Sequence, residues 1–147
     1  MEISYGHIDG IKIGQIFETR QALIDAGMHP HREAGIWGSS KNAACSIVLS
    51  GGYEDDLDEL DFVLYTGHGG QKNKVQVADQ DFSAKRGWGN KGLVISYESN
   101  LPVRVIRGYQ IDNGPTSGYR YDGLYYVEKY ERVRGKSGYF VCRFYLR

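Results

Sequence analysis

The sequence predicts an α+β fold in which a curved, barrel-like and mainly antiparallel β-sheet is flanked by helices. About seven runs of strand length, rich in β-branched and aromatic residues, follow one another along the chain. Only two segments have a helical pattern, so the helices are expected to lie at one side of the sheet. Neither an internal repeat nor a linker interrupts this order, and residues 1–147 are expected to form a single domain.

The helix predictions rest on two signals of unequal clarity. Residues 19–27 place their apolar side chains on one face and end at Gly27, which is typical of a helix C-terminus. Residues 77–85, in a polar and glycine-rich segment, could hold one short helix. The strands are expected at the end of a loop over residues 8–17 and at residues 43–49, 62–66, 93–97, 103–106, 121–130 and 139–146.

Composition places the chain among soluble globular domains. It is 41% hydrophobic and 24% charged, and no apolar run approaches the ~18 residues of a membrane-spanning helix. The first residues lack the basic and apolar pattern of a signal peptide. Cys45 and Cys142 lie in apolar runs and are expected to be core side chains in a reducing compartment. An intracellular protein is therefore expected.

The charge is balanced overall but not along the chain. Residues 1–70 contain four Lys or Arg and eleven Asp or Glu, whereas residues 71–147 contain fourteen and seven. Such asymmetry could give the folded molecule a basic face able to meet phosphate groups. The alternative is that the two signs mix once the chain is folded.

Several familiar binding patterns are incomplete. Residues 87–92 fit G-x-G-x-x-G, but no strand precedes them and a helix is not expected to follow. Residues 135–137 end like a phosphate-binding loop, yet Tyr130 stands where its first glycine is required. The two cysteines do not form a zinc-binding pattern. We therefore expect no cofactor and no metal ion.

The acidic loop leaves two interpretations open. Six carboxylates lie within residues 54–61, and with His68 they could serve a hydrolase that holds a divalent metal. Alternatively, Asp56 with Tyr53 and Tyr65 could form a pocket for a flat ring that carries amino hydrogens. Tyrosine faces stack on bases, and a carboxylate accepts well from cytosine N4.

At these residues the sequence resembles a known family, the SRA (SET- and RING-associated, or YDG) domain. The matching motifs are AGIWG (34–38), SGGYEDD (50–56), YTGHGG (65–70), ADQ (78–80), PVRVIR (102–107), YRYDGLY (119–125) and RGKSG (134–138). They occur in the family's order, and the similarity extends from about Gly6 to the last residue. The resemblance implies the SRA/PUA-like fold, whose barrel-like β structure agrees with the predicted elements.

The resemblance implies a reader that binds double-stranded DNA and flips out a modified cytosine. Tyr53 and Tyr65 would sandwich the base, Asp56 would accept from its N4 amino group, and Thr66 with the backbone of residues 50–52 would complete the edge. The C5 substituent would point toward residues 65–68. The implied base pocket consists of Ser50, Gly51, Gly52, Tyr53, Asp56, Tyr65, Thr66, Gly67 and His68.

Two departures from the vertebrate members concern specificity. The finger over residues 72–75 is shorter and has Val75 in place of an Arg, so a preference for hemimethylated CpG is not implied. His68 replaces a serine beside the C5 substituent, so 5-hydroxymethylcytosine is a candidate ligand along with 5-methylcytosine. The candidates for contacts to the grooves or phosphates are Arg32, Lys72, Asn73, Lys74, Lys85, Arg86 and Lys91, with Arg104, Arg107 and Arg120 as further basic candidates.

These features resemble bacterial members in which an SRA domain precedes an HNH nuclease domain in modification-dependent restriction enzymes. The implied partner is modified double-stranded DNA, with an HNH domain in the same chain or a homodimer through it, in the bacterial cytoplasm. The domain itself is expected to bind DNA and to have no catalytic residues. The alternatives are an enzyme that uses Asp56 and His68 on a base or phosphate, and a protein-interaction module without DNA binding.

Overall fold

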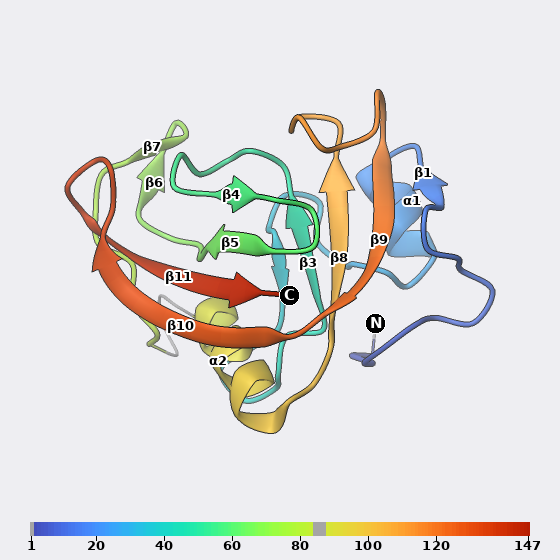
Figure 1. Cartoon of the computed structure of the whole chain (residues 1–147), viewed down its shortest axis with the longest axis horizontal. Coiled ribbons are helices and arrows are strands. Elements are labelled where there is room, and N and C mark those ends of the chain that lie inside the picture. The colour runs from blue at the N-terminus through green and yellow to red at the C-terminus, as the bar shows by residue number, and fades with distance from the viewer. Residues whose placement is uncertain (1, 84–87) are drawn as a thin grey trace.

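Two curved sheets make up most of the molecule (Figure 1), in a computed structural model that describes residues 2–83 and 88–147. The first sheet has five strands in the order β1 (Ile16–Phe17), β9 (Tyr119–Tyr125), β8 (Val103–Gly108), β3 (Ser46–Leu49) and β2 (Ile36–Trp37). The second has four in the order β10 (Val127–Arg134), β11 (Phe140–Leu146), β5 (Val63–Thr66) and β4 (Leu57–Asp58). A separate hairpin joins β6 (Gln71–Lys72) to β7 (Val75–Gln76).

The strand pairs agree with the predicted α+β class. Every pair is antiparallel except β3 with β8, which run parallel. Both sheets curve, but their hydrogen-bonded strand orders are open at the ends, so the described strands do not close into a barrel. Of the eleven strands within residues 2–83 and 88–147, five have only two residues. Periodicity cannot detect elements that short, which is why about seven strands were predicted.

In the part of the chain that the structure describes, two helices lie against the sheets. Helix α1 (Arg20–Asp25) confirms the helix predicted at residues 19–27, and the hydroxyl of Thr19 caps it by accepting from the Ala22 N–H at 3.1 Å. Helix α2 (Trp88–Ser99) lies beside β10 in Figure 1. Within the described residues, neither helix has the length and apolar character to cross a membrane.

Helix α2 overturns one predicted strand. Residues 93–97 were expected to be extended because Leu93, Val94 and Ile95 are consecutive and apolar, yet they lie inside the helix. The helix packs tightly against its neighbours, since a Cβ added at Gly92 would lie only 3.0 Å from the Ser39 nitrogen. The close packing of α2 against residues 38–44 therefore outweighs the β propensity of residues 93–97.

The helix predicted at residues 77–85 is also wrong over its described part, since residues 77–83 are not helical. This segment runs along β11 instead, where the Gln80 N–H donates to the Phe140 carbonyl at 2.8 Å. The predicted strand at residues 121–130 is divided at Tyr126 into β9 and β10, which belong to different sheets.

The core has two parts. The larger lies between the sheets and α2 and includes Ile47, Tyr65, Leu93 and Phe144. The smaller lies between the five-stranded sheet and α1, around Leu23. Cys45 and Cys142 are buried free thiols, as their apolar surroundings predicted.

Candidate base-binding site

A cavity of about 710 Å³ lies between β3, β5 and the loops that follow them. The residues of the predicted base pocket that line it are Ser50, Gly51, Gly52, Tyr53, Asp56, Tyr65 and His68. Thr66 and Gly67 do not line the cavity but hold neighbouring groups in place. The Thr66 N–H donates to Asp56, and the Gly67 N–H donates to the Cys142 carbonyl of β11 at 2.7 Å.

The two tyrosines of the cavity are fixed at their hydroxyl ends. Tyr65 projects from β5 into the core, and its hydroxyl donates to the Gly35 carbonyl at 3.2 Å. Burial raises the pKa of the Tyr65 phenol well above its ordinary value. The Tyr53 hydroxyl accepts from the Gly69 N–H at 3.1 Å. Both rings are therefore oriented before any ligand arrives.

Asp56 supplies a buried carboxylate to the same cavity. Its Oδ1 accepts from the backbone N–H of Thr66 at 2.7 Å, which fixes the side chain next to the end of β5. Burial raises the pKa of the Asp56 carboxyl to about 6, although the hydrogen bond from Thr66 acts in the opposite direction. At neutral pH the group is mainly ionised and can accept a further hydrogen bond.

His68 is held by the first turn of helix α2. Its Nε2 accepts from the Gly89 N–H at 3.1 Å, and its ring packs edge-on against Trp88 with 4.8 Å between centroids. Burial lowers the pKa of His68, so the ring is neutral at pH 7. Since a neutral imidazole carries one proton and Nε2 is an acceptor, the proton is on Nδ1.

The predicted groove and phosphate residues fall into separate groups. Arg32 and Lys74 line the cavity. Lys72 and Asn73 are exposed in the β6–β7 hairpin and do not line the cavity, and neither does Lys91 on α2. Lys85 and Arg86 lie outside the described residues.

Three further basic candidates have structural contacts instead. Arg104 and Arg107 are fully buried, which removes them as candidates for phosphate contacts. The Arg104 guanidinium donates to backbone carbonyls near the N-terminus, and Arg107 is paired with Asp58 at 2.6 Å. Arg120 is paired with Asp122, also at 2.6 Å.

The sequence did not indicate several residues that shape the cavity. Arg20 lines it and donates to the His31 carbonyl at 2.8 Å, which holds the loop that carries Arg32. Gln71 donates to the Gly52 carbonyl at 2.7 Å. Asn90 of α2 is fully buried and bonds the backbone of His68 in both directions. Arg20 and Gln71 lie outside the quoted motifs and Asn90 lies in the incomplete G-x-G-x-x-G pattern of residues 87–92, so only the fold reveals their roles.

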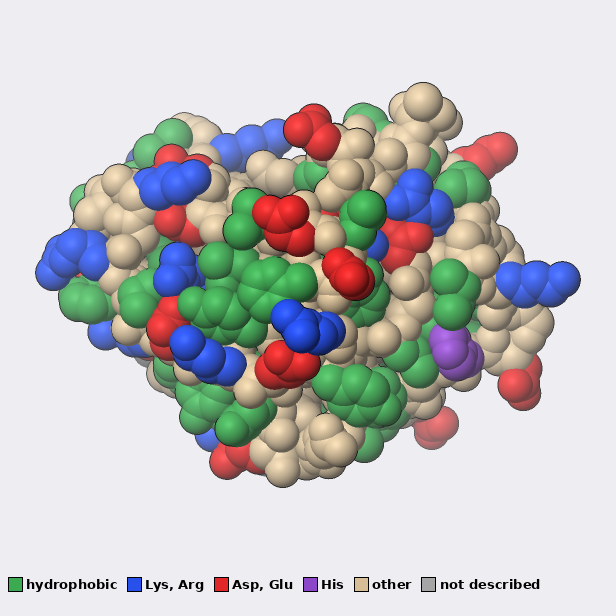
Figure 2. All heavy atoms as spheres, viewed as in Figure 1, with side chains coloured by type: hydrophobic (Ala, Val, Ile, Leu, Met, Phe, Trp, Pro, Cys, Tyr) green, Lys and Arg blue, Asp and Glu red, His purple; other side chains and the backbone are tan. Residues whose placement is uncertain are grey.

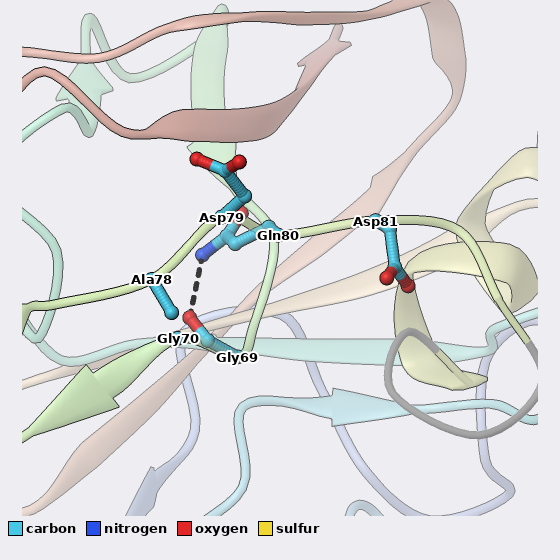
Figure 3. A pocket seen from close by; sticks show the side chains of 6 residues that line it. All are labelled: Gly69, Gly70, Ala78, Asp79, Gln80 and Asp81. Atoms are coloured by element: carbon cyan, nitrogen blue, oxygen red, sulfur yellow. Dashed lines mark hydrogen bonds between the residues drawn. The ribbon is translucent and has the colours of Figure 1, made fainter.

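A smaller cavity of about 350 Å³ lies on the other side of the Gly69–Gly70 segment. Figure 3 shows the Gln80 amide directed at the Gly69 carbonyl, whereas the carboxylates of Asp79 and Asp81 point away from it. Gln80 also donates to the Gly67 carbonyl and accepts from the Cys142 N–H. This buried side chain therefore fixes the loop that follows Tyr65.

No three His, Cys, Asp or Glu side chains among residues 2–83 and 88–147 converge closely enough to hold a metal ion. The acidic loop is instead divided between different contacts. Asp55 faces the β10–β11 hairpin, Asp56 faces the cavity, and Asp58 pairs with Arg107. The loop therefore offers the cavity one carboxylate, Asp56.

Comparison with known proteins finds relatives over nearly the whole chain. The chain is 36% identical to the E3 ubiquitin-protein ligase UHRF1 of Rattus norvegicus, over 97% of this chain and 21% of the ligase. Among solved structures, the modification-dependent TagI restriction endonuclease has a TM-score of 0.91 at 45% identity, over 97% of this chain and 51% of TagI. The SUVH5 SRA domain bound to fully hydroxymethylated CG DNA has a TM-score of 0.83 at 37% identity, covering 99% and 93%.

The chain spans about a fifth of the curated relative and about half of TagI. The model of the SAD/SRA domain family matches residues 4–147, which is nearly the whole sequence. The motifs, the two-sheet fold and this match all lead to one assignment. The chain belongs to the SAD/SRA domain family.

Proposed function

We propose that this domain binds double-stranded DNA and accepts a flipped, C5-modified cytosine in the 710 Å³ cavity. The observation that carries the proposal is that Tyr53, Tyr65 and the buried carboxylate of Asp56 line one cavity, with Arg20, Arg32 and Lys74 also in its wall. Two aromatic faces and one strong acceptor suit a flat base with an amino group, and basic side chains suit its phosphates.

The energies are sufficient for base flipping. Extruding a base costs a few kcal/mol in lost pairing and stacking. Stacking on Tyr53 and Tyr65 and an edge contact to Asp56 can each return ~1–3 kcal/mol. Burial of a C5 methyl group adds only ~0.8 kcal/mol, about a fourfold preference. Selection for cytosine should therefore be stronger than selection for the methyl group.

The β6–β7 hairpin and the loop that carries Arg32 are proposed to contact the duplex on either side of the flipped base. Lys72, Asn73 and Lys74 form the exposed end of the hairpin. Lys91 is proposed as a more distant phosphate contact. TagI, whose name describes a modification-dependent restriction endonuclease, supports a similar setting for this domain as the recognition part of a nuclease. An HNH domain in the same chain, or a dimer through it, belongs to that proposal.

One titration series tests the base-binding function. Matched duplexes carry cytosine, 5-methylcytosine, 5-hydroxymethylcytosine or its glucosylated form at one position, and binding is measured by fluorescence anisotropy at several salt concentrations. We expect tighter binding to at least one modified duplex. The logarithm of the affinity should fall steeply with the logarithm of the salt concentration, with a slope of about 0.9 for each neutralised phosphate. Incubation with Mg²⁺ or Mn²⁺ should leave the DNA intact, since the domain is proposed to bind without cutting.

Substitutions in the cavity separate recognition from folding. Asp56→Asn should weaken the binding free energy for the methylcytosine duplex by ~1–3 kcal/mol. It should also discriminate less against thymine, because the thymine O4 is an acceptor that opposes a carboxylate. Tyr53→Ala should lose the preference for modified DNA but keep weak binding to plain DNA. Tyr97→Ala, at a tyrosine 44% exposed on α2, is the matched control and should bind like the wild type. Equal losses on all duplexes, with lowered melting temperatures, would contradict the proposal.

A further inference from the structure

The tip of the β10–β11 hairpin contacts the loop that carries Tyr53 and Asp56, although these segments are far apart in sequence. The Asp55 carboxylate accepts from the Lys136 N–H at 3.0 Å, across 81 residues, and the Lys136 ammonium donates to the Glu54 carbonyl at 2.9 Å. A Cβ at Gly135 would lie 2.7 Å from the Asp55 carboxylate. The glycine therefore permits this close approach, because a side chain at position 135 would force the carboxylate to shift.

The same hairpin supports the opposite wall of the cavity. Strand β11 pairs with β5, so that Phe144 lies opposite Tyr65 and Arg143 lies opposite Thr66. The Cys142 carbonyl accepts from the Gly67 N–H at 2.7 Å. One hairpin thus contacts both the strand that carries Tyr65 and the loop that carries Tyr53 and Asp56.

We propose that Asp55 is a positioning residue, whose hydrogen bond to Lys136 holds residues 53–56 at the spacing from Tyr65 that a flipped base requires. The inference rests on the proposed function. Asp55 does not line the cavity and so does not touch the base. The Asp56 side chain is held by Thr66 at the end of β5, and the bond at Asp55 attaches the same loop to the β10–β11 hairpin, so the loop is held from two strands of the sheet.

The test compares the affinities of Asp55 variants for a modified duplex and for a plain duplex. Asp55→Ala removes the acceptor and should weaken binding of the 5-methylcytosine duplex by about two- to tenfold, the range for one hydrogen bond, with plain-duplex binding unchanged. Asp55→Asn keeps an oxygen that accepts from the Lys136 N–H, so it should bind both duplexes like the wild type.

Gly135→Ala tests the contact from its other side. The added methyl group should displace the Asp55 carboxylate and reproduce the loss seen for Asp55→Ala. In the double variant the carboxylate is absent, so the methyl group has nothing to displace and the loss should not exceed that of Asp55→Ala alone. Additive losses would overturn the assignment, because they would mean that the two residues act independently.

Other outcomes are equally decisive. A modified-duplex preference that Asp55→Ala leaves undiminished, a loss in Asp55→Asn as large as in Asp55→Ala, or equal losses on both duplexes would each overturn the role of Asp55 alone. A wild-type domain that binds modified and plain duplexes equally would overturn the proposed function and the role of Asp55 together. Thermal melting of each variant identifies losses caused by unfolding, and the Asp55→Asn comparison then decides.

Discussion

At the scale of single residues, the hydrogen bonds around His68 leave one ring N–H that we propose as a contact for the C5 substituent of a bound base. Because Nε2 accepts from the Gly89 N–H, the Nδ1–H is the ring's remaining polar group. No described residue accepts from this donor by a hydrogen bond. A 5-hydroxymethyl group offers an oxygen that could accept from it, whereas a 5-methyl group does not. His68 is therefore expected to bias the cavity toward oxygen-bearing C5 substituents.

Replacement of His68 by Phe tests this bias, since Phe keeps a ring of similar size and lacks both nitrogens. Any cost of leaving the Gly89 N–H unpaired falls equally on all ligands, so the ratio of affinities is informative. We expect the ratio of 5-hydroxymethylcytosine to 5-methylcytosine affinity to fall by about two- to tenfold in His68→Phe, the value of one hydrogen bond. An unchanged ratio in paired duplex titrations would contradict the assignment.

At the scale of elements, a helix or strand could be predicted from the sequence when it was long and when its contacts did not override its local pattern. The strands at residues 43–49, 62–66 and 139–146 were predicted from their apolar runs. The structure buries these runs in the larger core. Residues 93–97 carry the same signal but form a helix, since Gly89 and Gly92 let α2 approach its neighbours closely. The β6–β7 hairpin has two-residue strands, and its turn depends on backbone angles that composition does not report.

That turn places two non-glycine residues in the left-handed region, Asn73 at φ 53° and Lys74 at φ 64°. Asn tolerates this region, whereas Lys does so at a cost of roughly 1 kcal/mol. Lys74→Gly should therefore raise the free energy of unfolding slightly and yet weaken binding to all duplexes, with the salt slope reduced by about 0.9. Lys12→Ala, at an exposed lysine outside the cavity wall, controls for net charge. Lower stability, or unchanged salt dependence, in Lys74→Gly would argue against a strained DNA contact.

At the scale of the whole molecule, folding brings together side chains that are far apart in the sequence. The face in Figure 2 shows acidic and basic side chains interspersed around a hydrophobic area, so on this face the charge asymmetry between the two halves does not persist. The cavity likewise combines motif residues such as Tyr53 and Tyr65 with Arg20 and Gln110 from distant segments. Motifs predicted the first group because their residues are close in sequence. The second group is set by strand order, which no local pattern encodes.

Two buried groups, His29 and Asp56, change the free energy of unfolding in opposite directions as pH falls. Buried His29 bonds Ser46 and the Ala34 carbonyl, and burial lowers its pKa to about 3. Its unfolded form binds a proton below about pH 6.5, so its stabilising contribution is lost as pH falls from there toward 3. Asp56, whose pKa is raised to about 6, contributes in the opposite direction. Protonation of its folded form stabilises the protein as pH falls from 6 to about 4.

Substitution of Asp56 should therefore expose the acid sensitivity that this carboxylate offsets. Asp56→Asn keeps an oxygen for the Thr66 N–H but cannot take up a proton. Between pH 6 and 4, the free energy of unfolding of wild type minus that of Asp56→Asn should increase by about 1.4 kcal/mol for each unit that pH falls. Urea unfolding of both proteins at pH 7, 6, 5 and 4 measures this difference. Parallel pH profiles would mean that Asp56 has an ordinary pKa and that water reaches its carboxylate freely, contrary to a buried base-reading acceptor.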